Sequence, residues 1–300
     1  MSESFAFPDP AVPRVLEDKT IVVAGGGRGI GKATAVYLAD AGANVVVNRV
    51  SEDQTVAEVI AERGGEGRMH VGDISDLDYS AALVEDTVAD YGRLDGVINF
   101  AGVTDDTTLV RMTGEQWDWV INVHLRGHFS LLRAAARHWR EAAGDEGLDP
   151  QRSFVTLTSR NAFGSFGQAN YATAKAGILG LTWTAAAELY RYNVRVNALM
   201  PLAFTEMIAE IPEEHRPDDW TMEQMPPGKV APVAAYLLSD AAEDVTGVTV
   251  YAGGDRVALS ADPQPASHAV MPGGWTPEAL AESFDDLAEG VEVTRTERFI

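Results

Sequence analysis

A glycine-rich turn directly after a short apolar run is the feature that most restricts how this chain can fold. The run Thr20–Ala24 leads into Gly25-Gly26-Gly27-Arg28-Gly29-Ile30-Gly31, and a helical pattern follows. Such a turn lets a pyrophosphate approach backbone N–H groups, and the helix start adds partial positive charge. The turn therefore predicts a dinucleotide site, with contacts from Gly25, Arg28, Gly29, Ile30 and Gly31.

Further apolar, β-rich runs alternate with helical patterns, which is typical of repeated βα units and a parallel sheet. Continuous apolar stretches such as Val45–Val47 suit strands that are covered on both faces. We therefore expect a three-layer α/β fold with a seven-stranded parallel sheet. The predicted strands are 20–24, 44–48, 68–71, 97–99, 153–158, 194–199 and 248–251, and the predicted helices are 31–41, 52–63, 81–91, 117–143, 171–190 and 230–238.

Local signals divide the rest of the chain. Ser51 and Gln54 form a predicted capping box for the second helix, and Thr276-Pro277 predicts a further helix start. The segment 202–227 is rich in Pro and acids, so we expect a mobile substrate lid there. We expect one domain over 1–300, with a core of about 18–254 and a C-terminal extension of 255–300.

Composition excludes several functions. The formal net charge is −22, which argues against nucleic acid and anionic membrane surfaces as partners. The absence of cysteine excludes disulfides, thiolate metal sites and cysteine nucleophiles. No apolar run approaches the ~20 residues that span a bilayer, and the first residues lack an export-signal pattern. We expect a cytoplasmic protein without a metal site.

The acidic, lysine-poor composition has two open explanations. It suits a high-salt cytoplasm, where salt screens the self-repulsion, and it equally suits ordinary acidic bias from a GC-rich genome. Activity and melting temperature measured against KCl concentration separate them, because full stability without salt contradicts a halophilic origin.

Tyr171 and Lys175 are the strongest candidates for catalysis. They lie four residues apart on one predicted helix, so their side chains are neighbours. A free phenol has a pKa near ~10, which is too high for acid–base work at neutral pH. A neighbouring ammonium favours the phenolate and brings the pKa toward the working range. With the upstream glycine turn, the pair predicts nicotinamide-dependent hydride transfer.

The motifs as a set resemble the short-chain dehydrogenase/reductase family. The glycine spacing is Gly-x-x-x-Gly-x-Gly, the pair is Tyr-x-x-x-Lys, and Asn99-Phe100-Ala101-Gly102 follows the fourth predicted strand. The resemblance covers about 20–254 and implies a Rossmann fold. It also implies that Lys175 donates to the cofactor ribose.

The resemblance implies further cofactor contacts. Relatives specific for NAD carry an acid directly after the second strand, where this chain has Arg49. Arg49 and Arg28 together suit a 2′-phosphate, so we favour NADP(H) over NAD(H). The remaining contacts implied are Asp73 and Ile74 at the adenine, Asn99, Ala101 and Gly102 at the ribose, and Pro201 and Thr205 at the nicotinamide.

Two further catalytic positions follow from the resemblance. A hydroxyl should orient the substrate oxygen, and both Thr158 and Ser159 are candidates; we prefer Ser159. Asn122 matches the asparagine that holds a water beside the lysine in relatives. His124 and His128 lie nearby, and we expect them to serve packing or an interface.

The runs around Tyr171 and over 123–129 are similar to the branch containing the (3R)-hydroxyacyl-CoA dehydrogenase domain of peroxisomal multifunctional enzyme type 2. Bacterial 3-oxoacyl thioester reductases are near that branch. The resemblance implies interconversion of a secondary alcohol and a ketone, on a 3-hydroxyacyl/3-oxoacyl thioester or a similar apolar substrate. A ketosteroid or other carbonyl reductase and a non-catalytic NADP-binding regulator remain alternatives. Relatives pair the two long helices between subunits, which implies a homodimer or homotetramer.

Overall fold

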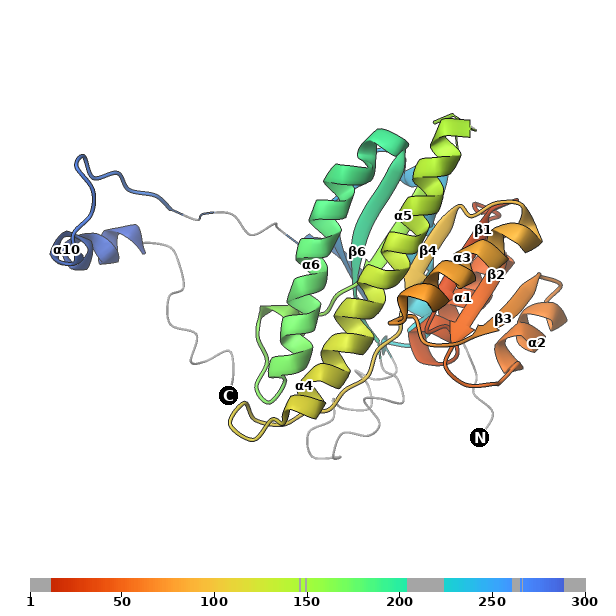
Figure 1. The fold of residues 1–300 in the computed structure, drawn as a ribbon, viewed down its shortest axis with the longest axis horizontal. Coiled ribbons are helices and arrows are strands. Elements are labelled where there is room, and N and C mark those ends of the chain that lie inside the picture. The colour runs from red at the N-terminus through yellow and green to blue at the C-terminus, as the bar shows by residue number, and fades with distance from the viewer. Residues whose placement is uncertain are drawn as a thin grey trace. The chain divides into compact units, whose positions relative to one another are not determined.

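The computed structural model describes residues 12–145, 147–148, 150–203, 224–260, 265 and 267–288. The chain divides into two compact units, Met1–Ser260 and Ala261–Ile300. The first unit contains an eight-stranded sheet in the order β3-β2-β1-β4-β5-β6-β7-β8 (Figure 1). The second contains α10 (Pro277–Leu287), which Thr276 caps as its sequence predicts.

Seven strands of the sheet run parallel, as the sequence predicts. An eighth strand, β8 (Arg256–Ser260), pairs antiparallel with β7 and was not predicted. The count of seven is therefore wrong, and the sheet continues into the residues assigned to the extension. The parallel strands are β1 (Thr20–Ala24), β2 (Asn44–Arg49), β3 (Gly67–Val71), β4 (Gly96–Asn99), β5 (Arg152–Leu157), β6 (Val194–Leu202) and β7 (Thr249–Gly253).

Helices cover both faces of the sheet, because alternate strand residues point to opposite sides. In β1, Ile21 and Val23 join one apolar cluster while Val22 and Ala24 join another. The first cluster includes residues of α1 (Gly29–Asp40), α2 (Thr55–Glu62) and α9 (Ala231–Leu238). The second includes residues of α3 (Leu77–Tyr91), α5 (Gly127–Asp145) and α6 (Ala169–Leu189), which lie toward the viewer in Figure 1.

The long helix expected over 117–143 contains an irregular turn. It begins as α4 (Gly114–Ile121), passes through a π-helical turn at Asn122–Arg126 and continues as α5. A π-turn inserts an extra residue into the helix, and such turns are frequent at functional sites. Here it shifts the side chains that precede α5 relative to a regular helix.

Two other local predictions have different outcomes. The capping box of Ser51 and Gln54 is wrong, because α2 begins at Thr55 and the carboxylate of Asp53 accepts the Thr55 N–H. Asp53 lies closer to the helix start and takes the role predicted for Ser51. Most of the predicted lid, 204–223, lies outside the described residues, as does Thr205.

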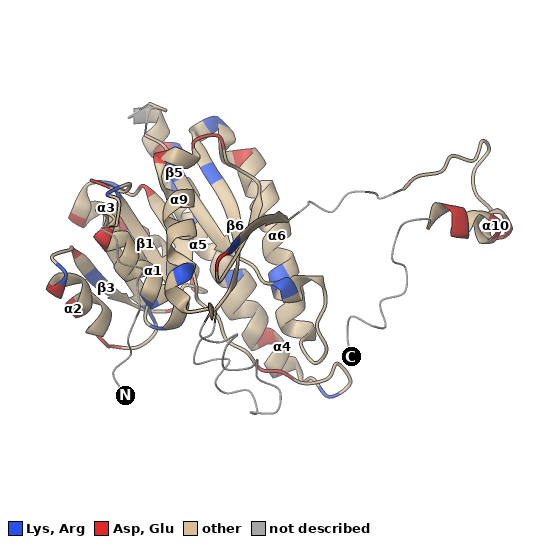
Figure 2. Cartoon of the chain, turned by 180° about the vertical axis from the view of Figure 1, so that it is seen from behind, with Lys and Arg blue, Asp and Glu red and all other residues tan. Residues whose placement is uncertain are grey.

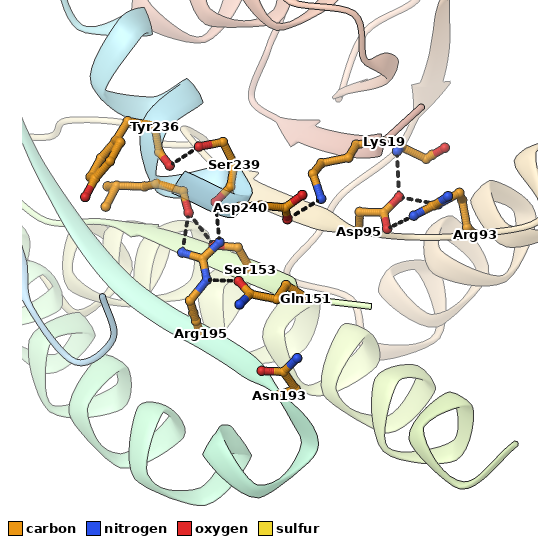
Figure 3. Close-up of polar contacts among 12 residues, drawn as sticks. Lys19, Arg93, Asp95, Gln151, Ser153, Asn193, Arg195, Tyr236, Ser239 and Asp240 are labelled. Carbon is orange, nitrogen blue, oxygen red and sulfur yellow. Dashed lines mark hydrogen bonds and ion pairs between the residues drawn. The ribbon is translucent and has the colours of Figure 1, made fainter. Parts of the chain in front are cut away.

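The amino end of the sheet holds a cluster of paired charges (Figure 3). Lys19 donates from Nζ to Asp240 Oδ1 at 2.7 Å. The buried carboxylate of Asp95 accepts the Thr20 N–H at 2.8 Å, and it also accepts hydrogen bonds from Arg93 Nε and Nη2, each at 2.7 Å. These contacts tie the starts of β1 and β4 to the segment after α9.

Arg195 completes this cluster from β6. Its guanidinium donates to the carbonyls of Leu237 at 2.8 Å and Ser239 at 2.9 Å (Figure 3). These carbonyls lie at the end of α9, where intrahelical partners run out, so a buried cation both satisfies them and complements the helix dipole. The cluster is therefore a structural device that fixes α9 to the sheet.

Charged residues lie mainly on helices and loops, and acids outnumber bases by 45 to 23 (Figure 2). Within α10 alone the acids are Glu278, Glu282, Asp285 and Asp286. Among the described residues, every helix is too short or too polar to cross a bilayer.

Candidate active site

The glycine turn lies at the carboxyl end of β1, where the strand order reverses between β1 and β4. Open α/β sheets bind ligands at this switch point. Gly25 has φ +66°, and a Cβ there would lie 2.3 Å from the Ala101 nitrogen. A Cβ on Gly31 would lie 2.3 Å from the Gly25 carbonyl oxygen. Only glycine therefore permits the turn to fold this tightly against the Asn99–Gly102 segment.

The start of α1 fits an anionic ligand. Its N-cap residue, Arg28, makes no side-chain capping hydrogen bond, and the first turn contains no acid. The first N–H groups of a helix have no intrahelical partner and attract phosphate. The backbone at Gly29 and Ile30 thus presents donors where the sequence predicts the pyrophosphate.

Arg49 lies at the end of β2 and reaches the glycine turn. Its Nε would lie 3.0 Å from a Cβ built on Gly27, so the guanidinium lies against that turn. It also bonds Ser51 Oγ at 3.1 Å and forms an ion pair with Asp53. Thr55 and then Arg49 lower the pKa of the Asp53 carboxyl to about 2. The Arg49 guanidinium therefore lies where the sequence predicts the ribose 2′ position of the cofactor. Asp53 partly neutralises its charge.

The carboxyl end of β4 presents buried polar groups. Asn99 Oδ1 accepts the Ala101 N–H at 2.9 Å, whereas Asn99 Nδ2 has no partner among the described residues. A buried amide N–H without a partner is costly, so this donor fits a ligand hydroxyl. These residues lie together with the glycine turn, as the sequence predicts.

Asp73 and Ile74 follow β3. Asp73 Oδ1 accepts the Ser75 N–H at 2.8 Å. The Ile74 side chain is buried in the core, and its carbonyl accepts the Ser80 hydroxyl at 2.8 Å. The fold thus already uses the side chain and carbonyl of Ile74, and the adenine contact expected of Asp73 and Ile74 stays a prediction.

Tyr171 and Lys175 lie in the first half of α6, one turn apart. Lys175 Nζ lies 5.5 Å from the centroid of the Tyr171 ring and donates to the Leu157 carbonyl at 2.8 Å. The Lys175 side chain is 1% exposed, and burial lowers its pKa from the ordinary 10.5 to about 7. The amine is therefore poised to gain or lose a proton near neutral pH.

The phenol of Tyr171 differs in one respect from expectation. The sequence predicts a pKa lowered by Lys175, but burial raises the pKa of the phenol, and the nearby charge of Asp106 adds to this. A hydrogen bond with Ser159 acts in the opposite direction. The reason is desolvation, which penalises the phenolate when the phenol is enclosed.

The two candidate hydroxyls take different positions. Ser159 hydrogen-bonds Tyr171 and accepts the Asn161 N–H at 3.2 Å. Thr158 is buried, and its hydroxyl donates to the Lys175 carbonyl at 3.0 Å. The structure thus brings Ser159 to the phenol, whereas Thr158 fixes the backbone of α6.

Asn122 begins the π-turn, and the water-holding role expected of it stays a prediction. Its Nδ2 donates to the Ser75 hydroxyl at 2.8 Å, which links the π-turn to the segment after β3. His124, from the same π-turn, instead contacts Tyr171 edge-on, with ring centroids 5.1 Å apart. Sequence reasoning missed this role, because the extra residue of the π-turn changes which side chain faces α6.

Two loops meet beside Tyr171. The Thr107 N–H donates to the Gly167 carbonyl at 2.8 Å, and Gln168 Nε2 donates to Asp106 at 2.6 Å. Phe166, on one of these loops, is largely exposed. These contacts join the segment after β4 to the segment before α6, and both segments lie next to Tyr171. Pro201 lies in β6 next to β7, at the same end of the sheet.

Comparison with known proteins identifies the class. The family model described as enoyl-(acyl carrier protein) reductase matches residues 24–254. This chain belongs to the short-chain dehydrogenase/reductase family, whose members are NAD(P)-dependent oxidoreductases. The Rossmann-type sheet and the family expectation from the sequence are confirmed.

Individual relatives show which branch of the family this chain is similar to. Hydroxyacyl-CoA dehydrogenase ChsB1 of Mycobacterium tuberculosis is 37% identical over 302 residues, covering 97% of this chain and 95% of that protein. Peroxisomal multifunctional enzyme type 2 of Mus musculus is 32% identical over 79% of this chain, which spans 32% of that protein. A short chain dehydrogenase from Mycobacterium avium superposes with a TM-score of 0.82 at 32% identity, over 92% of this chain and 96% of that one. The predicted resemblance to the hydroxyacyl-CoA branch is confirmed.

Proposed function

We propose that this protein interconverts a secondary alcohol and a ketone, with Tyr171 as the general acid and base. The observation that carries the proposal is the convergence of Tyr171, Lys175 and Ser159 at the carboxyl end of the sheet, the same end that holds the glycine turn. A phenol, an amine that titrates near neutrality and an orienting hydroxyl are the groups that carbonyl reduction needs.

Each residue has a distinct task. The reduced nicotinamide supplies a hydride to the carbonyl carbon when it is bound. Ser159 donates a hydrogen bond to the carbonyl oxygen and holds it beside the phenol. Tyr171 transfers its proton to that oxygen, which completes the alcohol. Lys175 in its charged form stabilises the phenolate that remains.

The substrate that we propose is a 3-oxoacyl or 3-hydroxyacyl thioester. Support comes from the names of the relatives and from exposed apolar side chains on the two loops that are joined beside Tyr171, namely Leu109, Val110, Phe163 and Phe166. Such a rim suits an acyl chain, because it contributes apolar contact area.

A substrate panel tests this assignment. Acetoacetyl-CoA, longer 3-oxoacyl-CoAs, a ketosteroid and simple sugars are each incubated with NADPH, and loss of NADPH absorbance is followed. We expect the highest kcat/KM with a 3-oxoacyl-CoA. Preference for the ketosteroid would favour the steroid alternative. Tight NADPH binding without turnover of any substrate would favour a regulator.

NADP(H) is the cofactor that we propose. Support comes from Arg49, whose guanidinium lies against Gly27 where relatives specific for NAD carry an acid. We expect Arg49→Asp to lower kcat/KM for NADPH by about 10-fold or more and to improve NADH use. Arg63→Asp is a matched control, because it makes the same charge change at the C-cap of α2, where the partner of the arginine is Asp40. Equal effects of both variants on NADPH would contradict the role of Arg49.

We also propose a homodimer or homotetramer that uses the outer face of α4 and α5. A hollow there is lined by residues that include Trp119, Leu125 and Phe129, and two of these are unusually exposed, Trp119 by 48% and Phe129 by 45%. Exposed aromatic groups around an apolar hollow suit a subunit interface. Light scattering of Phe129→Asp tests the proposal: dissociation to monomers supports this face, and an unchanged mass contradicts it.

A further inference from the structure

Two adjacent acids in the segment after β4 contact different helices. Gln116 Nε2, in α4, donates to Asp105 Oδ1 at 2.7 Å. Gln168 Nε2 donates to Asp106 Oδ2 at 2.6 Å, and Gln168 is the residue that directly precedes α6. The carboxylate of Asp105 is therefore turned toward α4, whereas that of Asp106 is turned toward the start of α6.

The backbone on both sides of Asp106 is also fixed to the region where α6 starts. Asn170 is buried, and its Nδ2 donates to the Asp105 carbonyl at 3.0 Å. The Thr107 N–H donates to the Gly167 carbonyl at 2.8 Å. These bonds hold Asp106 next to the first turn of α6, which carries the candidate catalytic phenol.

The side-chain amide of Gln168 has a defined orientation. Its Oε1 accepts from Asn161 Nδ2 at 2.5 Å, and its Nε2 donates to Asp106. An ionised carboxylate only accepts hydrogen bonds, so the amide nitrogen must face Asp106. Asn161 in turn donates its backbone N–H to Ser159 Oγ at 3.2 Å. Two amides thus connect the Asp106 carboxylate to the loop that carries the candidate orienting hydroxyl.

The charge of Asp106 reaches the phenol of Tyr171. Burial raises the pKa of this phenol most, and the charge of Asp106 raises it further. A carboxylate that disfavours the phenolate also disfavours a second negative charge that a substrate brings to the same place. The carbonyl oxygen of a substrate has to lie beside the phenol to receive its proton. A negative group close to that carbonyl is therefore repelled by Asp106.

We propose that Asp106 is a specificity-determining residue, which favours neutral carbonyl substrates over substrates that carry a carboxylate close to the ketone. This inference rests on the proposed function and gives a physical reason for a thioester substrate. A 3-oxoacyl thioester has a neutral group next to the methylene that follows its ketone, and the free 3-oxo acid has a carboxylate at that position. Asp106 repels the free acid and accepts the thioester.

Acetoacetamide and acetoacetate are a matched pair of probes, because they have nearly the same shape and differ by one negative charge. Their kcat/KM values are measured with NADPH for the parent and two variants. We expect the parent to prefer acetoacetamide and Asp106→Asn to reduce this preference by about fivefold, the effect of two unit charges about 4 Å apart in water. Asp106→Glu keeps the charge, so we expect it to keep the preference.

Asp105→Asn is a matched control for the general acidity of the protein. The formal net charge is −22, which repels anions at long range wherever they bind. Asp105→Asn removes the same charge one residue away, and its amide oxygen can still accept from Gln116. We expect it to leave the preference at the parental ratio. An equal loss of preference in both asparagine variants would overturn the role of Asp106.

Binding supplies a readout that does not depend on turnover. With NADP⁺ in place of NADPH neither probe can be reduced, and ligand-observed NMR gives the Kd of each. We expect the ratio of the two Kd values to move toward one in Asp106→Asn and to stay at the parental value in Asp106→Glu and Asp105→Asn. An unchanged ratio in Asp106→Asn would overturn the inference even if the proposed reaction is observed.

Failure of the whole substrate panel would contradict the proposed function alone, because the Kd ratios still show whether Asp106 selects by charge. Conversely, turnover of the panel by a parent protein that uses acetoacetate as well as acetoacetamide would support the proposed function and overturn the role of Asp106.

Discussion

At the amino end of the sheet, Lys19, Asp95 and Arg195 each have charged or carbonyl partners supplied by the fold (Figure 3). At the carboxyl end, Lys175 Nζ donates to the Leu157 carbonyl, and Asn99 Nδ2 has no partner among the described residues. The charged groups of the amino-end cluster are therefore paired by the fold itself, whereas at the carboxyl end one buried amide N–H of Asn99 is left for another partner.

This difference separates structural from functional polar groups. An unsatisfied buried donor or acceptor costs stability, so a fold retains it where a ligand or substrate satisfies it. Paired groups at the amino end should affect stability when they are changed. The groups at the carboxyl end should affect catalysis.

Lys175→Met should produce the largest loss of activity. The substitution keeps much of the side-chain volume but removes the amine, so we expect kcat/KM to fall by about 10³-fold or more. Steady-state kinetics with the best panel substrate measure this. Near-parental kinetics would show that the site at the carboxyl end of the sheet does not need the Lys175 amine.

The same variant should change how stability depends on pH. The pKa of Lys175 is about 7 in the folded protein and 10.5 ordinarily. Between pH 7 and pH 10.5 the unfolded chain therefore binds one more proton at this residue than the folded protein does. Parent stability should therefore rise with pH through this window relative to Lys175→Met, by about 4 kcal/mol over three units. Urea unfolding of both proteins at pH 7 and pH 10 measures the difference, and a difference that is independent of pH contradicts the shifted pKa.

Ser159→Ala and Thr158→Val compare two adjacent hydroxyls. Ser159 hydrogen-bonds the phenol, so its loss should lower kcat by about 10²-fold with little change in stability. Thr158 bonds the α6 backbone, so its loss should cost about 1 kcal/mol of stability and little activity. Turnover and melting temperature of both variants decide the comparison, and the reverse pattern would assign the catalytic role to Thr158.

Asp95→Asn should affect only stability. Asp95 is buried and bonds Thr20 and Arg93, so the neutral amide should cost about 1 to 3 kcal/mol of unfolding free energy. We expect an unchanged KM and kcat, because the change lies at the opposite end of the sheet. A loss of activity larger than the fraction of unfolded protein explains would contradict separate roles for the two ends of the sheet.

Much of the fold follows from local sequence. The run Val45–Val47 predicts a buried strand, and β2 occupies those residues. Strand β8 was missed because Arg256–Ser260 is short and lies beyond the last predicted strand, and its Val257 and Leu259 are exposed and join no core. Its pairing depends on the neighbouring edge of β7, which no local pattern contains.

The candidate site was predictable where motifs fix spacing along one element. Tyr171 and Lys175 share one helix, so their proximity follows from helical geometry. His124 reaches Tyr171 only through the π-turn and through the space at Gly102, two tertiary features. The choice between Ser159 and Thr158 likewise depends on the direction in which β5 ends.

The central claim is that Tyr171 transfers a proton while the bound nicotinamide transfers a hydride. Its most direct test is the kcat/KM of Tyr171→Phe, measured together with the Kd for NADPH. We predict a loss of about 10³-fold or more in kcat/KM with the Kd within about threefold of the parent, because only the phenolic oxygen is removed. Turnover of Tyr171→Phe at the parent rate would contradict the account.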